Sequence, residues 1–416
     1  MNKQTTVIYF APFAVMPKTF DRNLFFARAH YFAFMGGWGF ILPFINLFYV
    51  SLGLKGAQIG TITSTSSIVG LLFAPFIVNE IKKRPQARGL LQTAMLLGAL
   101  GYFMLGHQTI YLLILVNVFF QALAGSGVMP VSDAMAVSVS KEAGGGYGSI
   151  RVFASLGWIV ATLTSGWLIQ RFGFLVGFIG VSVMWSLGAL IISFINPRFF
   201  VTQQSTQSSK PNLLTTAKRV ISDRTLLGFA IALIFIGFMN SGVLQFENVF
   251  LAELGTSKQL ISVAGILSAV VELPFMIYAD RFVKRYGASQ ILLVAILMTM
   301  IQRAAVLLFP SIATIMIVRF IGGTAFSMYT VSYIGLISSR TDQSETGTML
   351  ALYTVTLASL VNILAAPVSG AIFDVIGARW LYALSASGYA IGAICIWLSR
   401  PTVVLNNESV PTLQPE

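Results

Sequence analysis

Residues 226–253, LLGFAIALIFIGFMNSGVLQFENVFLAE, decide the fold of this chain. An α-helix rises about 1.5 Å per residue, so about 20 apolar residues span the roughly 30 Å hydrocarbon core of a bilayer. A helix also satisfies its backbone hydrogen bonds within the segment, as lipid requires. The stretch therefore predicts a membrane-spanning helix. Glu247 within it needs a partner, a wet cavity or a function, because burying a charge in lipid costs a few kcal/mol or more.

Runs of the same kind recur along the whole chain. The protein has 416 residues, of which 56% are hydrophobic and 10% charged, and its mean hydropathy is +0.81. A soluble protein of this length could not cover its surface with so few charges. We predict an all-α membrane protein with twelve transmembrane helices, at roughly residues 24–50, 57–79, 89–106, 109–138, 148–169, 174–196, 226–253, 259–279, 289–309, 311–338, 347–372 and 379–399.

The positive charge of the chain lies mostly outside these runs. The net charge is +12, which on a soluble protein would suggest nucleic-acid binding. Here the lysines and arginines concentrate in alternate short loops, as expected when cationic loops stay in the cytoplasm. The pattern predicts a multi-pass protein of the plasma (inner) membrane with both termini cytoplasmic. It also predicts that the protein contacts the lipid bilayer and no nucleic acid.

Cysteine and histidine are too scarce for several classes of site. The chain has one cysteine, Cys395, and two histidines. This composition excludes an internal disulfide framework and argues against a structural metal site. The glycine run at 144–146 lacks the strand, lysine and helix context of a phosphate-binding loop. We therefore expect no enzyme activity, no cofactor and no metal.

A polar interruption divides the chain into two halves. Its centre is rich in serine and glutamine, which is typical of a flexible linker. The pair Ser165-Gly166 is followed by Gly173, and Ser369-Gly370 is followed by Gly377 at the equivalent point of the second half. This repeat predicts two pseudo-symmetric six-helix halves. The expected segments are a cytoplasmic tail (1–23), an N-terminal half (24–196), a cytoplasmic linker (197–225), a C-terminal half (226–399) and a cytoplasmic tail (400–416).

The loops between the second and third spans of each half share a charge pattern. Residues 79–84 read NEIKKR, and residues 280–287 read DRFVKRYG. An acid followed by basic residues just below the bilayer can tie two helix ends together and hold a gate closed. The candidate gating residues are Glu80, Lys83, Asp280, Arg281 and Arg285.

The spans, the linker and these loops together resemble the major facilitator superfamily over nearly the whole chain. Residues 147–158, YGSIRVFASLGW, resemble the fifth-helix segment of the lactose permease and phenylpropionate permease groups. Residues 129–134, MPVSDA, resemble the end of their fourth helix. Residues 300–303, MIQR, resemble a ninth-helix segment with a proton-coupling arginine, and residues 270–274, VVELP, resemble an eighth-helix segment with an acid.

The resemblance implies a substrate-binding role for three residues of the first half. Asp133, Arg151 and Trp158 match the acid, the arginine and the tryptophan that contact the sugar in lactose permease. We expect Asp133 and Arg151 to form a charge pair at the floor of the cavity, which exchanges partners when a polar substrate binds. The alternative is a structural salt bridge between two helices.

Two residues of the second half match proton-coupling positions. Glu272 is the leading candidate for the proton carrier, and Arg303 on the neighbouring span is expected to interact with it. The alternative is a protonated glutamic acid that serves only as a hydrogen-bonding group. The tenth-helix histidine and acid of lactose permease are replaced by Gly322 and Ala325, so the phenylpropionate-like branch is favoured over the disaccharide branch.

Four other ionisable residues lie within apolar runs. Glu247 is an alternative proton-coupling residue, a binding residue or an outward-facing, solvated side chain, and the last interpretation is favoured. Arg28 is expected to extend its charge to the membrane surface, and His30 to make a local hydrogen bond. Arg319 is either a substrate anchor or a structural residue.

These observations predict a secondary active transporter that works by alternating access. The favoured mechanism is proton-coupled uptake of a small organic solute, which could be an aromatic or organic acid, a sugar or a nucleoside. The expected partners are that solute and protons, and the family resemblance implies a monomer. The alternatives are proton-driven efflux of drugs or metabolites and, less favoured, a non-transporting membrane sensor.

Overall fold

The computed structural model describes residues 21–200 and 213–400, and these residues form helices without a β-strand. Within this part of the chain, twelve helical segments are long and apolar enough to cross a membrane. They coincide with the twelve predicted spans to within a few residues, so the predicted fold class is confirmed. The outer parts of the predicted tails (1–20 and 401–416) and the Ser- and Gln-rich stretch (201–212) lie outside the described residues.

The helices follow the order of the predicted spans. The N-terminal half contains α1 (Arg22–Ile41), α2 (Ile45–Ser51), α3 (Gly56–Lys83), α4 (Ala87–Leu105), α5 (Tyr111–Gly125), α6 (Val128–Glu142), α7 (Gly148–Phe172) and α8 (Leu175–Ile192). A 3-10 turn (Pro197–Phe199) and α9 (Leu213–Ser222) belong to the connection between the halves. The C-terminal half contains α10 (Arg224–Glu253), α11 (Lys258–Tyr286), α12 (Ala288–Leu308), α13 (Ile312–Arg340), α14 (Gln343–Ala351), a π-helical segment (Leu352–Leu357), α15 (Ala358–Ile376) and α16 (Ala378–Ser399).

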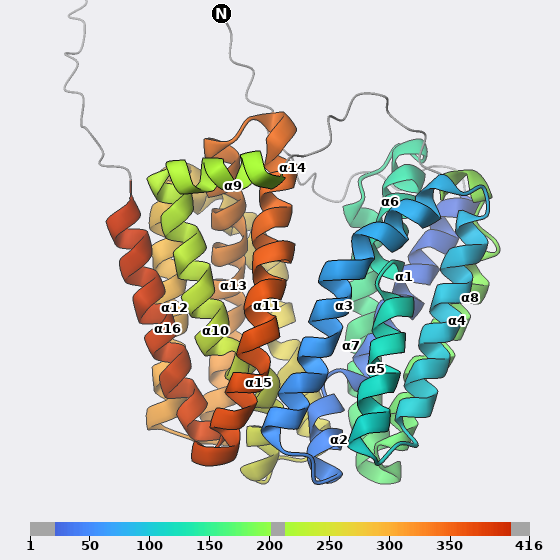
Figure 1. The fold of residues 1–416 in the computed structure, drawn as a ribbon, viewed down its shortest axis with the longest axis horizontal. Coiled ribbons are helices and arrows are strands. Elements are labelled where there is room, and N and C mark those ends of the chain that lie inside the picture. Colours follow the sequence, from blue (N-terminus) through green and yellow to red (C-terminus); the bar gives the residue numbers. More distant parts are fainter. Residues whose placement is uncertain (1–20, 201–212, 401–416) are drawn as a thin grey trace, which may run out of the picture.

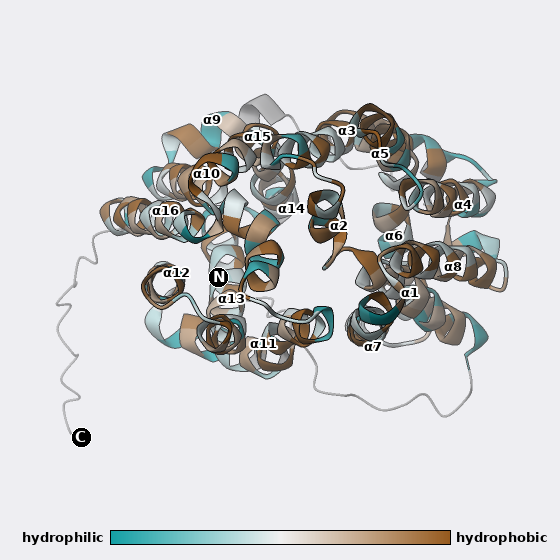
Figure 2. Cartoon of the chain, turned by 90° about the horizontal axis from the view of Figure 1, so that it is seen from below, coloured by the Kyte–Doolittle hydropathy of each residue, from teal (hydrophilic) through white to brown (hydrophobic). Residues whose placement is uncertain are grey.

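The two halves lie side by side and converge at one end of the bundle (Figure 1). We call the end that carries α2 the α2 end, and the opposite end, which carries α9, the α9 end. Within the halves, α1 packs against α7 and α8, and α10 packs against α15 and α16. Between the halves, α3 packs along α15 and α7 along α11. Viewed from the α2 end, α2 lies between the two halves (Figure 2).

The first predicted span, 24–50, is broken in the structure into α1 and α2. Pro43 lies at the break and has no backbone N–H, so the Gly39 carbonyl one turn earlier loses its helical donor. Two hydroxyls of α7 replace that donor, from Thr162 at 3.3 Å and from Ser165 at 3.4 Å. The break therefore leaves no unsatisfied carbonyl at Gly39 and fastens α1 to α7.

Pro367 has a similar effect inside α15, but here the freed carbonyl is used by the other half. The missing N–H of Pro367 leaves the Ile363 carbonyl without its helical donor. The Ser64 hydroxyl of α3 donates to that carbonyl at 2.6 Å. One turn further along α3, the Ser67 hydroxyl accepts a hydrogen bond from Asn362 at 2.8 Å. Ser64 and Ser67 of α3 therefore form a bonding surface for α15.

The α3–α15 contact is closest where small residues face each other at the α2 end. A Cβ atom added to Gly370 would lie 2.0 Å from the Gly56 carbonyl oxygen, so only glycine allows this approach. Asp374 then accepts hydrogen bonds from the backbone N–H groups of Gly56 at 2.6 Å and Ala57 at 3.0 Å. These are unpaired donors at the N-terminus of α3, where the helix dipole favours a negative charge. A carboxylate of one half therefore caps a helix of the other.

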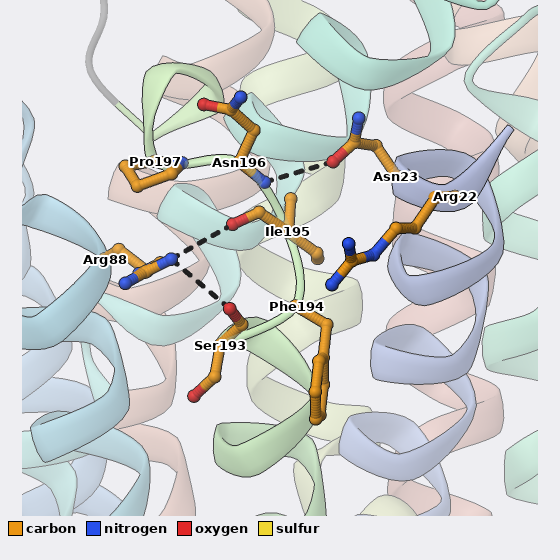
Figure 3. A pocket seen from close by; sticks show the side chains of 8 residues that line it. All are labelled: Arg22, Asn23, Arg88, Ser193, Phe194, Ile195, Asn196 and Pro197. Carbon is orange, nitrogen blue, oxygen red and sulfur yellow. Dashed lines mark hydrogen bonds between the residues drawn. The ribbon is translucent and has the colours of Figure 1, made fainter.

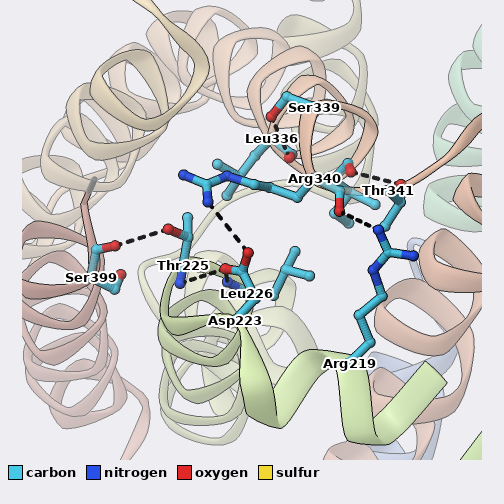
Figure 4. A network of polar contacts seen from close by, with 10 residues as sticks. Arg219, Asp223, Thr225, Leu226, Leu336, Ser339, Arg340, Thr341 and Ser399 are labelled. Carbon is cyan, nitrogen blue, oxygen red and sulfur yellow. Dashed lines mark hydrogen bonds and ion pairs between the residues drawn. The ribbon is translucent and has the colours of Figure 1, made fainter. Parts of the chain in front are cut away.

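The connection between the halves contains an ordered helix, although the sequence predicts a flexible linker over 197–225. Arg219 of α9 forms an ion pair with Glu345 and donates to the Arg340 carbonyl at 3.1 Å. Asp223 caps α10 and receives the Arg340 guanidinium at 3.3 Å (Figure 4). The part of the predicted linker that forms α9 is therefore attached to the C-terminal half at its α9 end.

Candidate functional site

A cavity of about 920 Å³ lies among the helices of the C-terminal half, and Ser67 of α3 contributes to its wall. This volume suits a small organic ligand. The charged residues of its lining are Glu247, Glu272, Arg303 and Arg319, which come from four different helices. Three of the four were singled out as proton-coupling candidates from the sequence.

Glu247 is the centre of a cluster of polar side chains in the cavity wall. Arg319 of α13 donates to Glu247 Oε2 at 2.9 Å, and the Tyr382 hydroxyl of α16 donates to Oε1 at 3.0 Å. Arg303 of α12 lies 3.7 Å from the same Oε1 atom. Arg319 also donates to Asn248 Oδ1 at 2.7 Å. One carboxylate thus connects α10 to three helices of the same half.

The burial of this cluster corrects the favoured interpretation of Glu247. The side chains of Glu247, Arg303 and Arg319 are 15%, 14% and 17% exposed. Glu247 is therefore not a solvated, outward-facing side chain. A carboxylate this buried needs partners of opposite charge, and two arginines supply them. The cluster carries one positive charge more than it carries negative.

Glu272 lies in the same cavity but outside this cluster. Its side chain is half-buried, and within residues 21–200 and 213–400 it forms no ion pair closer than 4.0 Å. Its backbone carbonyl accepts a hydrogen bond from Ser327 of α13 at 2.9 Å. The expected interaction between Glu272 and Arg303 is thus replaced, in this conformation, by the pair between Arg303 and Glu247.

Unused hydrogen-bond donors face the same region. Arg303 Nε and Gln302 Nε2 are buried and have no hydrogen-bond partner in the described part of the chain. Both residues belong to α12 and line the cavity. Buried polar groups of proteins are normally paired, so these two donors keep a bonding capacity that the described residues do not use. Asn240 and Asn362 add further polar groups to the lining.

The N-terminal half holds Asp133 in a different way from the expected charge pair. Asp133 Oδ1 accepts hydrogen bonds from the Tyr31 hydroxyl at 2.5 Å and from the Tyr147 hydroxyl at 2.7 Å. Burial and the bond to Asp133 raise the pKa of Tyr147 to about 12, so this hydroxyl remains a donor at neutral pH. Among the described residues, Arg151 lies farther than 4.0 Å from Asp133 and forms no ion pair with it. Tyr31 and Tyr147 thus bind the Asp133 carboxylate, which was predicted from the sequence to pair with Arg151.

Arg151 and Trp158 both lie on α7 and are partly buried. The chain is tightly packed here, because a Cβ atom on Gly39 of α1 would lie 2.8 Å from the Trp158 carbonyl oxygen. Neither residue belongs to the lining of the cavity in the C-terminal half. Their substrate-binding role stays a prediction.

The candidate gating residues lie at the α9 ends of α3 and α11. Glu80 pairs with Arg84, one helical turn away, and Asp280 pairs with Lys284 at 2.8 Å, also one turn away. Arg281 and Arg285 lie over the rings of Tyr278 and Tyr286. Lys83 is exposed. In this conformation each acid is paired within its own helix, and the gating role stays a prediction.

A second, smaller pocket of about 290 Å³ lies at the α9 end of the N-terminal half (Figure 3). Arg88 donates there to the carbonyls of Ser193 and Ile195, each at 3.3 Å. Asn23 accepts from the Asn196 backbone at 3.0 Å. Basic side chains commonly satisfy the last carbonyls of a helix in this way, so the pocket is explained by capping of α8.

The two remaining ionisable residues of the first span have structural surroundings. His30 is fully buried and lies 3.2 Å from the Gly188 carbonyl and 3.0 Å from the Ser132 hydroxyl. The Arg28 guanidinium lies over the Phe153 ring at 5.5 Å. The local hydrogen bonding expected for His30 is present.

Sequence reasoning missed several members of the site. Tyr382 of α16 donates a hydrogen bond to Glu247, and Tyr389 of the same helix lines the cavity. From the sequence alone, a tyrosine with such a role in an apolar span cannot be distinguished from one that only packs in the core. Asn248 was detectable, because it directly follows Glu247 and is polar in an apolar run. Its partner on the other half, the Pro43 carbonyl, was not.

Comparison with known proteins gives consistent matches. A model of the MFS_1 like family matches residues 25–384. The chain is similar to an uncharacterized transporter, YwbF, of Bacillus subtilis (strain 168), with 26% identity over 367 residues that cover 86% of this chain and 90% of that protein. It is also similar to a maltose permease of Geobacillus stearothermophilus, with 29% identity over 274 residues, 65% of this chain and 67% of the permease.

Solved structures show the same fold. A crystal structure of the nucleoside transporter NupG superposes with a TM-score of 0.76 at 16% sequence identity, and the match covers 91% of this chain and 99% of that one. At this identity the likeness concerns the fold and not the substrate.

Proposed function

This chain belongs to the MFS_1 like family and is a multi-pass transporter of small molecules, and we propose that it takes up a small organic solute together with protons. The observation that carries the proposal is the cavity of the C-terminal half, which combines a cluster of paired charges around Glu247 with one carboxylate outside any ion pair, Glu272. The charge cluster would serve as a binding surface for the solute, and the carboxylate of Glu272 as the proton acceptor that coupling requires.

Glu272 is the proposed proton carrier. A carrier must exchange a proton with water during the cycle, so its carboxylate has to be accessible from the cavity and free of a permanent counter-charge. Glu272 lines the cavity without an ion-pair partner among the described residues. Glu247 is a poorer choice, because two guanidinium groups stabilise its ionised form.

The charges of the lining favour an organic acid as the solute. With Glu272 ionised, two arginines balance two glutamates. With Glu272 protonated, the lining carries one net positive charge, which favours an anion. Uptake of a proton would thus prepare the cavity for a carboxylate, whose negative charge would restore the balance. Relatives of this chain are named as transporters of sugars, nucleosides, aromatic acids and drugs, and the charge balance selects the acids among these classes.

The membrane orientation follows from the charges of the loops. We assign the α9 end to the cytoplasm, because the cationic loops lie there, and we propose that the protein resides in the plasma membrane as a monomer. The hydrogen bonds that join the halves gather toward the α2 end, for example from the N-terminus of α3 to Asp374 and from Ser64 to α15. The structure then corresponds to a state closed toward the outside.

The test measures external pH in lightly buffered, de-energised cells that express the protein. One pool contains small aromatic and aliphatic monocarboxylates, and the other contains their primary amides together with sugars and nucleosides. We expect transient alkalinisation with the carboxylates, and its loss in Glu272→Gln. Glu253→Gln is the matched control, because the same chemical change then falls on an exposed residue at the end of α10. Silence with both pools, in cells shown to contain folded protein, would contradict proton-coupled uptake.

The alternative is proton-driven efflux. It is favoured by one observation, that several relatives are named as multidrug resistance proteins. Efflux would use the same cavity and carboxylate in the opposite direction. Resistance of expressing cells to toxic compounds, lost in Glu272→Gln and combined with silence in the pH assay, would establish it in place of uptake.

A further inference from the structure

One side chain connects the charge cluster of the cavity to the opposite half of the protein. Asn248 Oδ1 accepts the Arg319 guanidinium at 2.7 Å, within the C-terminal half. The Nδ2 group of the same amide donates to the Pro43 carbonyl at 2.7 Å, at the break between α1 and α2. Because the Asn248 amide bonds to both groups, it fixes the position of Arg319 relative to Pro43.

The Pro43 carbonyl is available because the chain is not helical there. α1 ends at Ile41 and α2 begins at Ile45, so Pro43 lies in the turn between them. Near this point a second bond joins the same two elements, since Asn46 of α2 donates to the Gln245 carbonyl at 2.7 Å. The α1–α2 turn is therefore held against α10 by two asparagines, of which only Asn248 also bonds to the cavity cluster.

We propose that Asn248 is a positioning residue that couples the state of the charge cluster to closure of the α2 end. Arg319 is a cationic group that a bound anion would attract away from Asn248. When Arg319 moves away, Asn248 Oδ1 no longer accepts its hydrogen bond. The amide is then free to rotate, and the Pro43 carbonyl loses the Nδ2 donor. The closed α2 end is then weakened in response to an event inside the cavity.

The inference rests on the proposed role of this cavity, but its test needs no substrate. Spin labels are attached to cysteines at Ser51 and Gln259, two exposed positions at the α2 end, one in each half. The native cysteine is first removed by Cys395→Ser. Distance distributions of the purified full chain in lipid nanodiscs then give the ratio of open to closed molecules, for single and double variants.

The decisive variants are Asn248→Ala and Arg319→Met. Methionine keeps an unbranched side chain without a donor, and its introduction leaves Glu247 paired with Arg303, so no uncompensated buried charge prevents folding. A hydrogen bond to a charged group corresponds to about a 10- to 150-fold change in an equilibrium constant. We expect each single variant to raise the open-to-closed ratio about tenfold or more, and the double variant to raise it no further.

Asn46→Ala is the matched control, because it removes a bond between the same two elements without touching the cluster. Its effect should multiply with that of Arg319→Met. Asn248→Asp tests the donor separately, since it keeps the acceptor for Arg319 but loses the N–H group that reaches Pro43. It should open the α2 end as Asn248→Ala does.

Three results would overturn the inference. The first is an unchanged ratio in Arg319→Met, and the second is a double variant whose effect equals the product of the two single effects. The third is a closed α2 end in Asn248→Asp. Because the readout is a distance, failure of proton-coupled uptake in the pH assay would leave this result unaffected, and the two proposals fail separately.

Discussion

Gly60→Ala offers a direct test of the contact that closes the α2 end. Gly60 lies on α3 against the Pro367 region of α15. A Cβ atom at this position would lie 2.1 Å from the Ala366 carbonyl oxygen, whereas ordinary contacts begin at 3.4 Å. The obstacle is backbone, which cannot rotate away as a side chain can. The two helices would have to separate by about the difference, 1.3 Å.

The expected magnitude follows from the packing. Adding a methyl group to a well-packed contact costs about 1–3 kcal/mol. Separation of the helices also stretches the bond from Ser64 to the Ile363 carbonyl, which is 2.6 Å long and is worth about 1 kcal/mol. Both costs fall on the closed state alone, because the helices are apart in the open one. A total of about 2–4 kcal/mol corresponds to about a 30- to 700-fold rise in the open-to-closed ratio.

The assay is the spin-label distance across the α2 end, with Gly70→Ala as the matched control. Gly70 lies on the same helix, and a Cβ atom there would meet nothing within 4 Å. The control carries the same gain in helix propensity, up to about 1 kcal/mol, in both conformations. We expect Gly60→Ala to populate the open state and Gly70→Ala to match the parent protein. Equal distance distributions in the two variants would refute the argument that backbone contact limits how closely α3 and α15 approach each other.

Three further predictions concern other contacts. Asp374→Ala removes the carboxylate that caps α3 from the other half, and because such caps contribute about 0.5–2 kcal/mol, the same distance measurement should show about a 2- to 30-fold rise in the open-to-closed ratio. Tyr147→Phe removes one of the two donors to Asp133. Folding raises the pKa of Tyr147 from about 10 to about 12, so the stabilisation by this hydroxyl is complete below pH 10 and is lost as the pH rises from 10 to 12. The free energy of unfolding should therefore fall less steeply over this pH range in the variant than in the parent protein. Arg219→Ala removes a partly exposed ion pair worth less than about 1 kcal/mol. Hydrogen exchange should accelerate in α9, while the distance across the α2 end stays unchanged. Unchanged exchange would contradict the role of Arg219 in attaching α9 to the C-terminal half.

The sequence predicted the helical architecture well because the signal for each span is collective. Twenty apolar residues identify a span whatever their order, so Gly56–Lys83 and Ala378–Ser399 were recognised within a few residues. The break at Pro43 was not predicted, although proline was visible. Proline in a transmembrane helix is tolerated when neighbouring hydroxyls satisfy the freed carbonyl, and whether Thr162 and Ser165 are close enough is a property of the folded chain.

The candidate site was predicted by residue type but not by pairing. Glu247, Glu272 and Arg303 were identified because ionisable residues are costly within apolar runs, and all three line one cavity. The assignment of partners failed, since Arg303 contacts Glu247 and not Glu272. Helices that neighbour each other in sequence offer similar depths for a charge, and only the rotation of each helix decides which pair meets.

The way the two halves are joined has a consequence for how sequence changes accumulate in this protein. In three bonds between the halves the donor is a side chain and the acceptor is a main-chain carbonyl: Ser64 to Ile363, Asn46 to Gln245, and Asn248 to Pro43. Every residue type provides a carbonyl, so Ile363 can be exchanged for another apolar residue without loss of its bond, whereas Ser64 cannot lose its hydroxyl. We therefore expect substitutions to accumulate at accepting positions such as Ile363, while the donating side chains of Ser64, Asn46 and Asn248 stay constant.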